Sequence, residues 1–203
     1  MEPRAKNLRS EDILEVATRL FAERGYEGVS MHDVAEKVGM GKASLFYHFA
    51  SKEVLYEAVV EGVIASLEEP LSAIYASEGS FAERLDALTS TLTGALGSRP
   101  YAARLLLRET MDWGPVMRGQ LVERILLVLE AGAAWVRAGQ NEGSFDTGDP
   151  RHLILSVLGM HLMPFAIDRL VDRYMGGAPF KPKFVAERSR ELQLQARRLH
   201  LKR

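Results

Sequence analysis

The chain of 203 residues is 47% hydrophobic and carries 26 basic and 27 acidic side chains, so it can bury one or two cores and has nearly balanced charge. It contains no cysteine, which excludes a disulfide framework and a thiolate metal site and suits the cytoplasm. It has no HExxH motif, no GxSxG motif and only five scattered histidines, so we expect no enzyme, no cofactor and no metal site.

The first predicted helix begins after Ser10, where Glu11 and Asp12 complement the positive end of a helix dipole. Apolar residues then recur at three- and four-residue spacing, which is typical of a helix with one buried face. These residues are Ile13, Ala17, Leu20 and Phe21. We expect this helix to brace the two that follow it.

Residues 30–52 predict a short helix, a tight turn and a second short helix. Ser30 is a good N-cap, Asp33 is placed to close a capping box, and Gly39 supplies the left-handed residue that ends the first helix. In the second helix, residues 42–49, apolar side chains fall on one face and polar ones on the others. This spacing is that of a helix-turn-helix. Its expected core residues are Val34, Ala35, Val38, Leu45 and Phe49.

Helix-turn-helix geometry also occurs in plain helical bundles, so the spacing alone leaves a DNA-binding role and a structural role open. Residues 37–52 contain Lys37, Lys42 and Lys52 and no acidic residue, which makes a local positive patch in a neutral chain. The second helix therefore presents donors and a cation beside an N-terminus that itself favours anions.

Residues 13–56 resemble the N-terminal DNA-binding domain of the TetR family of transcriptional repressors. The matching features follow one another along the chain: Phe21, Gly25-Tyr26, Ser30, Asp33-Val34-Ala35, Gly39-Met40-Gly41-Lys42, Leu45-Phe46-Tyr47-His48-Phe49 and Ser51-Lys52-Glu53. The resemblance covers about the first quarter of the chain. Met40 and Gly41 stand where the family often has a small residue and a serine, and Phe46 stands where it often has tyrosine, so fewer hydroxyls are available to phosphate.

The resemblance implies a set of DNA contacts. Phosphates are expected to be held by the Ser30 hydroxyl, His32 and the backbone at Lys42. Ser44 and Phe46 are expected to contact base edges or thymine methyls. Tyr47, His48 and Lys52 are expected to contact the DNA backbone. Arg4, Lys6 and Arg9 are possible helpers on a mobile arm. For the lone His32, simple solvation is the alternative.

Turn residues divide the rest of the chain into further helices. The predicted helices cover residues 52–76, 81–96, 100–111, 116–138, 150–174 and 184–199. Pro70 is expected to bend or divide the first of these, and Pro164 to kink the helix 150–174. A Ser80–Glu83 capping box opens the helix 81–96. The sequence thus predicts an all-α fold of about nine helices. Residues 1–55 would form a three-helix helix-turn-helix DNA-binding domain, and residues 56–203 a larger helical effector-binding and dimerisation domain.

Charge differs along the chain. Residues 1–55 hold 8 basic and 9 acidic side chains, residues 56–180 hold 10 and 16, and residues 181–203 hold 8 and 2. Affinity for DNA must therefore come from the placement of a few cations. For the basic tail, a solvated face of an amphipathic helix is favoured over a nucleic-acid role.

The resemblance also implies that the larger domain senses an effector and dimerises. One short recognition helix reads few base pairs, so two copies on a two-fold axis are expected, and residues 150–174 and 184–199 are candidates for a four-helix dimer interface. Aromatic, adaptable and polar side chains offer an effector pocket, with ordinary core or surface roles as the alternative. These are Arg104, Arg108, Met111, Trp113, Met117, Trp135 and His161.

We therefore expect a cytoplasmic DNA-binding regulator. No membrane span is expected, because the most apolar stretch, residues 153–167, is short and interrupted by His161 and Pro164. The resemblance implies a homodimeric repressor that binds double-stranded DNA at a pseudo-palindromic operator and leaves it when a small, largely apolar effector binds. The alternative is a helical interaction scaffold that does not bind DNA.

Overall fold

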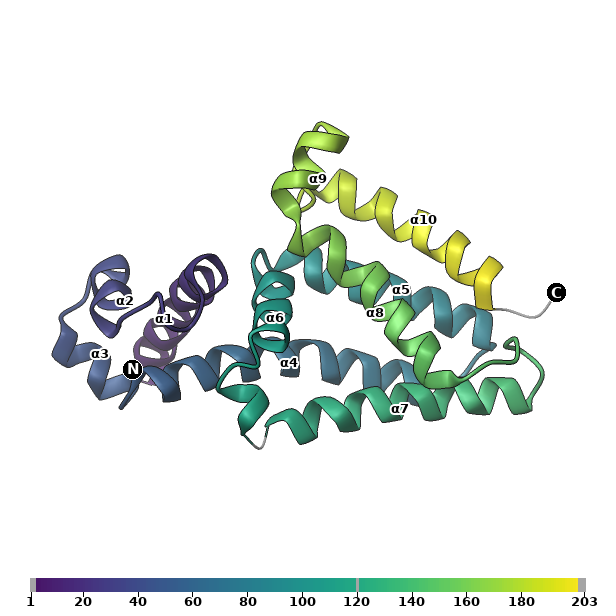
Figure 1. Cartoon of the computed structure of the whole chain (residues 1–203), viewed down its shortest axis with the longest axis horizontal. Helices are drawn as coiled ribbons and strands as arrows, with labels where there is room; N and C mark the ends of the chain where they lie inside the picture. The colour runs from purple at the N-terminus through teal and green to yellow at the C-terminus, as the bar shows by residue number, and fades with distance from the viewer. Residues whose placement is uncertain (1–2, 120, 201–203) are drawn as a thin grey trace. The chain divides into compact units, whose positions relative to one another are not determined.

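The computed structural model describes residues 3–119 and 121–200, and the regular elements in this part of the chain are all helices, as predicted (Figure 1). Side chains are described for residues 10–119 and 121–198. The helices are α1 (Pro3–Arg24), α2 (Met31–Val38), α3 (Lys42–His48), α4 (Lys52–Ala76), α5 (Phe81–Ser98), α6 (Ala102–Met111), the 3₁₀-helix η1 (Val116–Arg118), α7 (Leu121–Asn141), α8 (Pro150–Ala166), α9 (Asp168–Met175) and α10 (Pro182–His200).

Several predicted boundaries are wrong. Helix α1 begins at Pro3, a residue suited to a first helical turn, so the backbone of the expected mobile arm is helical. The side chains of Arg4, Lys6 and Arg9 are not among those that the structure describes. Pro70 lies inside α4 without dividing it. The predicted helix 116–138 begins instead as η1, which ends where Gly119 adopts extended backbone.

The predicted helix 150–174 is two helices, α8 and α9, which meet at Ile167 and are bent by 77°. Pro164 lies inside α8, three residues before the break. Proline has no N–H, so it leaves the Met160 carbonyl without its helical partner, and Arg188 of α10 donates from Nη2 to that oxygen at 2.9 Å. Within the described residues, no single helix has the length and apolar composition to cross a membrane, and only this bent pair meets that test jointly.

The chain forms two compact units. The head unit contains residues 1–64 and 104–122, and the body unit contains residues 65–103 and 123–203. The chain passes from one unit to the other three times, inside α4, α6 and α7. The predicted division into functional domains after residue 55 stays a prediction, but segment 104–122 belongs to the same compact unit as α1 to α3.

The core of the head unit is formed by the apolar faces predicted for α1 to α3. Ile13, Ala17, Val34 and Leu45 are fully buried, and Phe21 is 1% exposed. Three aromatic rings extend this core: Phe21, Tyr26 and Tyr56, with the Tyr56 ring centroid 4.8 Å from that of Phe21 and 4.9 Å from that of Tyr26.

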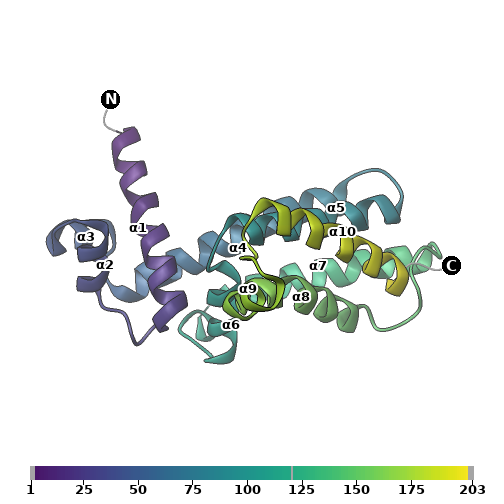
Figure 2. The same cartoon turned by 90° about the horizontal axis from the view of Figure 1, so that it is seen from above.

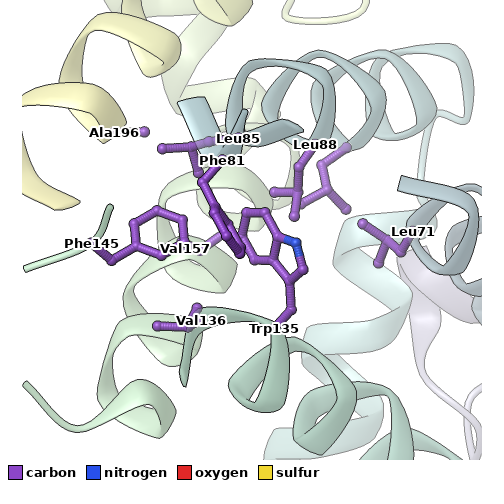
Figure 3. Packing of buried hydrophobic residues seen from close by; sticks show 10 residues of the cluster. Leu71, Phe81, Leu85, Leu88, Trp135, Val136, Phe145, Val157 and Ala196 are labelled. Atoms are coloured by element: carbon purple, nitrogen blue, oxygen red, sulfur yellow. The ribbon is translucent and has the colours of Figure 1, made fainter. Parts of the chain in front are cut away.

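The core of the body unit is centred on Trp135 of α7, which packs among Tyr75, Phe81 and Phe145 with ring centroids 5.2 to 5.6 Å away (Figure 3). A Cβ atom at Gly139, one turn after Trp135, would lie 2.2 Å from Phe145 Cδ2, so only glycine allows this ring to pack on α7. In Figure 3 the indole nitrogen of Trp135 lies on the side of Leu71 and Leu88.

Helix α10 runs beside α5 in the body unit (Figure 2). Apolar residues of α10 pack there, with Leu192 and Ala196 buried and Val185 against Gly97. Arg197 of the basic tail donates from Nε to Asp86 Oδ1 at 2.9 Å. These residues of α10 are thus covered by their own chain, while Leu194 of α10 and several apolar residues of α8 and α9 are exposed. These are Leu155, Leu158, Met163 and Leu170.

Candidate nucleic-acid interface

Helix α2 begins at the predicted capping box. Ser30 Oγ accepts a hydrogen bond from Asp33 N at 3.2 Å, and Asp33 Oδ2 accepts from Ser30 N at 2.8 Å and from the Ser30 hydroxyl at 2.6 Å. The side-chain and backbone hydrogen bonds from Ser30 lower the pKa of Asp33, so the carboxylate stays ionised at the positive end of α2. The Ser30 hydroxyl, predicted to hold a phosphate, therefore also fixes the start of this helix.

The turn between α2 and α3 depends on Gly39, which has φ +77° and ends α2 with hydrogen bonds from its N–H to the carbonyls of Ala35 and Glu36, as predicted. Gly41 is the N-cap of α3 and makes no side-chain capping bond. Leu45 is fully buried and Phe49 is 9% exposed, and these two anchors fix which face of α3 points outward.

The predicted DNA-contacting residues lie on the outward faces of α2, α3 and the start of α4. Six are exposed: Ser30, His32, Lys42, Ser44, Phe46 and Tyr47. His48 and Lys52 are half-buried. Phe46 and Tyr47 are 40% and 75% exposed, so these two aromatic side chains lie largely outside the core. Lys42 Nζ lies 5.7 Å from the centroid of the Phe46 ring one turn later. The arrangement offers hydroxyls, ring nitrogens, a cation and an apolar ring to a groove.

Lys52 has an intramolecular role that the sequence did not reveal. Its ammonium donates to the Tyr26 carbonyl at 2.8 Å, lies 4.1 Å from the centroid of the Tyr26 ring and is 3.8 Å from Glu27 Oε2. It thus holds the turn that precedes α2. His48 is also engaged, because its Nδ1 lies 3.4 Å from the Ser10 hydroxyl. Both contacts join residues more than twenty positions apart, so no local pattern signals them.

The residues predicted to line an effector pocket do not fall in one compact unit. Five belong to the head unit: Arg104, Arg108, Met111, Trp113 and Met117. Of these, Met111 and Trp113 are 80% and 58% exposed, and Met117 is buried. The other two, Trp135 and His161, belong to the body unit and are 7% and 3% exposed.

Both body-unit candidates have buried polar atoms that are unpartnered among the described residues. These atoms are Trp135 Nε1 and His161 Nε2, with Thr89 Oγ1 in the same condition on α5. His161 Nδ1 lies 2.8 Å from the Val157 carbonyl and must carry the proton, which leaves Nε2 as an acceptor. Burial lowers the pKa of His161 and the Arg188 charge adds to this shift, while the Val157 carbonyl and the backbone of Thr89 oppose it.

The described residues contain no group of three or more His, Asp or Glu side chains arranged to hold a metal ion. The described part of the site is a capped helix pair with donors on its outward faces.

Comparisons with known proteins agree with this geometry. The profile of bacterial regulatory proteins of the tetR family matches residues 13–59. The HTH-type transcriptional regulator RutR of Escherichia coli is 27% identical over 154 residues, which are 76% of this chain and 72% of RutR. The structure of the ketosteroid transcriptional regulator KstR2 of Mycobacterium tuberculosis has a TM-score of 0.81 at 20% identity and covers 96% of both chains. The structure of AibR with isovaleryl coenzyme A and operator DNA has a TM-score of 0.69 at 23% identity, over 92% of this chain and 97% of AibR. At these identities the two structures show the shared fold.

Proposed function

Because the chain belongs to the TetR family of bacterial regulatory proteins, we propose that it represses transcription from a pseudo-palindromic operator and is released by a small, largely apolar effector. Regulators of this family are DNA-binding transcription factors and not enzymes, and they bind operator DNA as homodimers. The observation that carries the proposal is the capped α2–α3 pair, whose buried anchors turn Lys42, Ser44 and Tyr47 outward. The protein would act in the cytoplasm, where DNA is accessible.

Each copy of α3 would enter a major groove. Ser44 and Phe46 would meet base edges or thymine methyls, while Ser30, His32, the Lys42 backbone, Tyr47, His48 and Lys52 would contact the DNA backbone. One short helix reads too few bases for selectivity, so two copies would bind half-sites about 34–36 Å apart or multiples of it.

Selection from a random-sequence duplex pool tests this proposal. We expect enrichment of an inverted repeat, and light scattering should give a dimer, or a pair of dimers on the selected duplex. A stable monomer at micromolar concentration, or a pool that shows no enrichment at moderate salt, would favour the scaffold alternative.

We place the effector site in the body unit, around Trp135 and His161. A buried N–H and a buried ring nitrogen without partners among the described residues are costly in an apolar core unless another molecule satisfies them. An effector with an apolar body and a carbonyl acceptor would meet the Trp135 N–H. The AibR complex, with its acyl thioester, supports an acyl group as the first chemistry to test.

The connections between the units suggest how such an effector would act. Every passage from body to head lies inside a helix, so a shift in the body unit would move along α4, α6 or α7 without a flexible linker to absorb it. A change in the separation of the two recognition helices would then weaken operator binding. A coupling of about 5- to 150-fold is the usual size for such a switch.

Tryptophan fluorescence tests the effector site. The variant Trp113→Phe leaves Trp135 as the sole tryptophan. Isovaleryl coenzyme A and free short-chain acids serve as first probes, and a bound probe should change the Trp135 emission. The selected duplex should weaken that probe's binding by the factor by which the probe weakens duplex binding. Equal probe affinities with and without duplex would mean DNA binding without induction.

A further inference from the structure

The head unit buries one carboxylate that its DNA contacts do not use. Glu109 of α6 is 2% exposed, and both of its oxygens accept hydrogen bonds. The Tyr56 hydroxyl, 53 positions away in the sequence, donates to Oε2 at 2.6 Å, and the Met117 N–H donates to Oε1 at 2.8 Å. Glu109 thus joins α6, η1 and the start of α4 within one compact unit.

The loop after α6 is built around this carboxylate. The N–H of Gly114 donates to the Glu109 carbonyl at 3.0 Å, and a Cβ atom at Gly114 would lie only 2.0 Å from Glu109 Oε2. Trp113 has φ +47°, a strained conformation for a non-glycine residue, and Arg118 Nε donates to its carbonyl at 2.9 Å. Strain of this kind persists only where the surroundings fix the backbone. The strained Trp113 therefore indicates that the contacts around Glu109 hold this loop in place.

Tyr56 carries the contact onward to the DNA-binding helices. Its ring packs edge-on against Phe21 of α1 and against Tyr26, which lies in the turn before α2. The carbonyl of Tyr26 in turn accepts the hydrogen bond from Lys52. Burial, and next the hydrogen bond to Glu109, raise the pKa of Tyr56 far above its ordinary value, so the hydroxyl remains a donor.

A second contact joins the same two segments. The Arg108 guanidinium lies against Gly25, because a Cβ atom at Gly25 would lie 2.9 Å from Arg108 Nη1. Gly25 has φ +76° and follows the last residue of α1, so Arg108 contacts the end of α1 directly, while Glu109 reaches α1 and the turn before α2 through Tyr56.

We propose that Glu109 is a positioning residue for DNA binding. Through Tyr56 it ties α1 and the turn before α2 to segment 104–122, and this segment thereby sets the orientation in which α3 meets the groove. For its DNA consequence the proposal rests on the proposed function. The tie itself concerns only the head unit and can be tested without DNA.

Hydrogen exchange of the full-length protein tests the tie. Tyr56→Phe removes only the hydroxyl, and Glu109→Gln keeps the shape but removes the charge. Losing a hydrogen bond to a buried charge corresponds to about 10-fold or more in an equilibrium, so amide exchange across residues 31–48 should quicken by about that factor in each variant. Tyr75→Phe, which removes a largely buried hydroxyl in the body unit, is the matched control and should leave these amides unchanged. Faster exchange confined to residues 104–122 and the first turns of α4 would overturn the proposal.

Affinity for the selected duplex provides the second readout. Each variant should weaken binding by about 10-fold, and the double variant should be no weaker than the poorer single one, because both remove one contact. Ile13→Val, which removes one buried methyl group from α1, controls for a plain loss of stability and should leave the affinity of the folded protein unchanged. If the losses of affinity in Tyr56→Phe and Glu109→Gln add up in the double variant, or if Ile13→Val loses as much affinity, then the Tyr56–Glu109 contact only stabilises the fold. If the parent protein selects no duplex, the proposed function fails, while the exchange measurement still decides the tie.

Discussion

The two compact units treat their buried polar groups differently. In the head unit the buried Glu109 carboxylate has a donor on each oxygen. In the body unit Trp135 Nε1, His161 Nε2 and Thr89 Oγ1 are buried without a hydrogen-bond partner among the described residues. The head therefore satisfies its buried carboxylate within its own fold, which fixes one geometry, whereas the body leaves some buried polar atoms unsatisfied by its described residues. The unit that we propose to read DNA needs the first property, and the unit that we propose to sense an effector needs the second.

The largest expected effect tests how closely the head is packed around its carboxylate. Gly114→Ala would place a methyl group 2.0 Å from Glu109 Oε2, and overpacking at a site held from both sides costs about 3 kcal/mol. Urea unfolding at fixed protein concentration measures this loss. Gly62→Ala is the control, because nothing lies within 4 Å of its Cβ and alanine favours a helix interior by about 0.5–1 kcal/mol. Equal stability of the two variants would mean that the loop yields easily.

A smaller effect should appear in the body unit as a dependence on pH. The pKa of His161 is lowered in the folded chain, so the unfolded chain binds the proton first as pH falls below about 6.5. The free energy of unfolding should therefore be flat above that pH, and below it should fall by up to about 1.4 kcal/mol per pH unit until the folded-state pKa is reached. His161→Gln should remove this component of the pH profile. Identical profiles for the variant and the parent would show that His161 is not the group that titrates.

The smallest effects separate two lysines at the interface. Lys52→Ala should weaken binding to all duplexes similarly, lower the salt slope by about 0.9, and cost about 0.5–1 kcal/mol of stability because the Tyr26 carbonyl loses its donor. Exposed Lys42→Ala should lower the salt slope by a similar amount and leave stability unchanged. Fluorescence anisotropy across a salt series, with urea unfolding, measures both. A changed sequence preference for Lys52→Ala with an unchanged slope would reverse its assignment as a backbone contact.

The helix-turn-helix could be predicted from the sequence because its signals are local. Ser30, Asp33 and Gly39 each act within one helical turn, and the structure places all three as predicted. The core positions Val34, Ala35, Leu45 and Phe49 follow from spacing alone and are buried, whereas Val38, also predicted as core, lies in the last turn of α2 and is only half-buried. Predictions of this kind rely on neighbours in the sequence, and such neighbours determine helix caps.

The errors lie where distant residues decide the structure. Pro164 marked the region where residues 150–174 would bend, but the helix continues past it and breaks at Ile167, and the carbonyl released by Pro164 is satisfied by Arg188 from α10. Glu109 was missed although it lies one turn after buried Leu105, on a face that should be apolar. An acidic residue at such a position indicates a buried partner, but only the fold identifies Tyr56.

The discontinuous head unit has a consequence for how the chain is made. Its first 64 residues leave the ribosome well before residues 104–122, which complete the same compact unit. Until Glu109 emerges, the Tyr56 hydroxyl lacks its Glu109 acceptor, although the Tyr56 ring can already pack against Phe21 and Tyr26. Domains generally fold as units during synthesis, so the head should acquire its final structure only after α5 and α6 have both been translated. A truncated chain that ends before α6 should accordingly yield an incompletely folded head, even though every helix of its recognition motif is present.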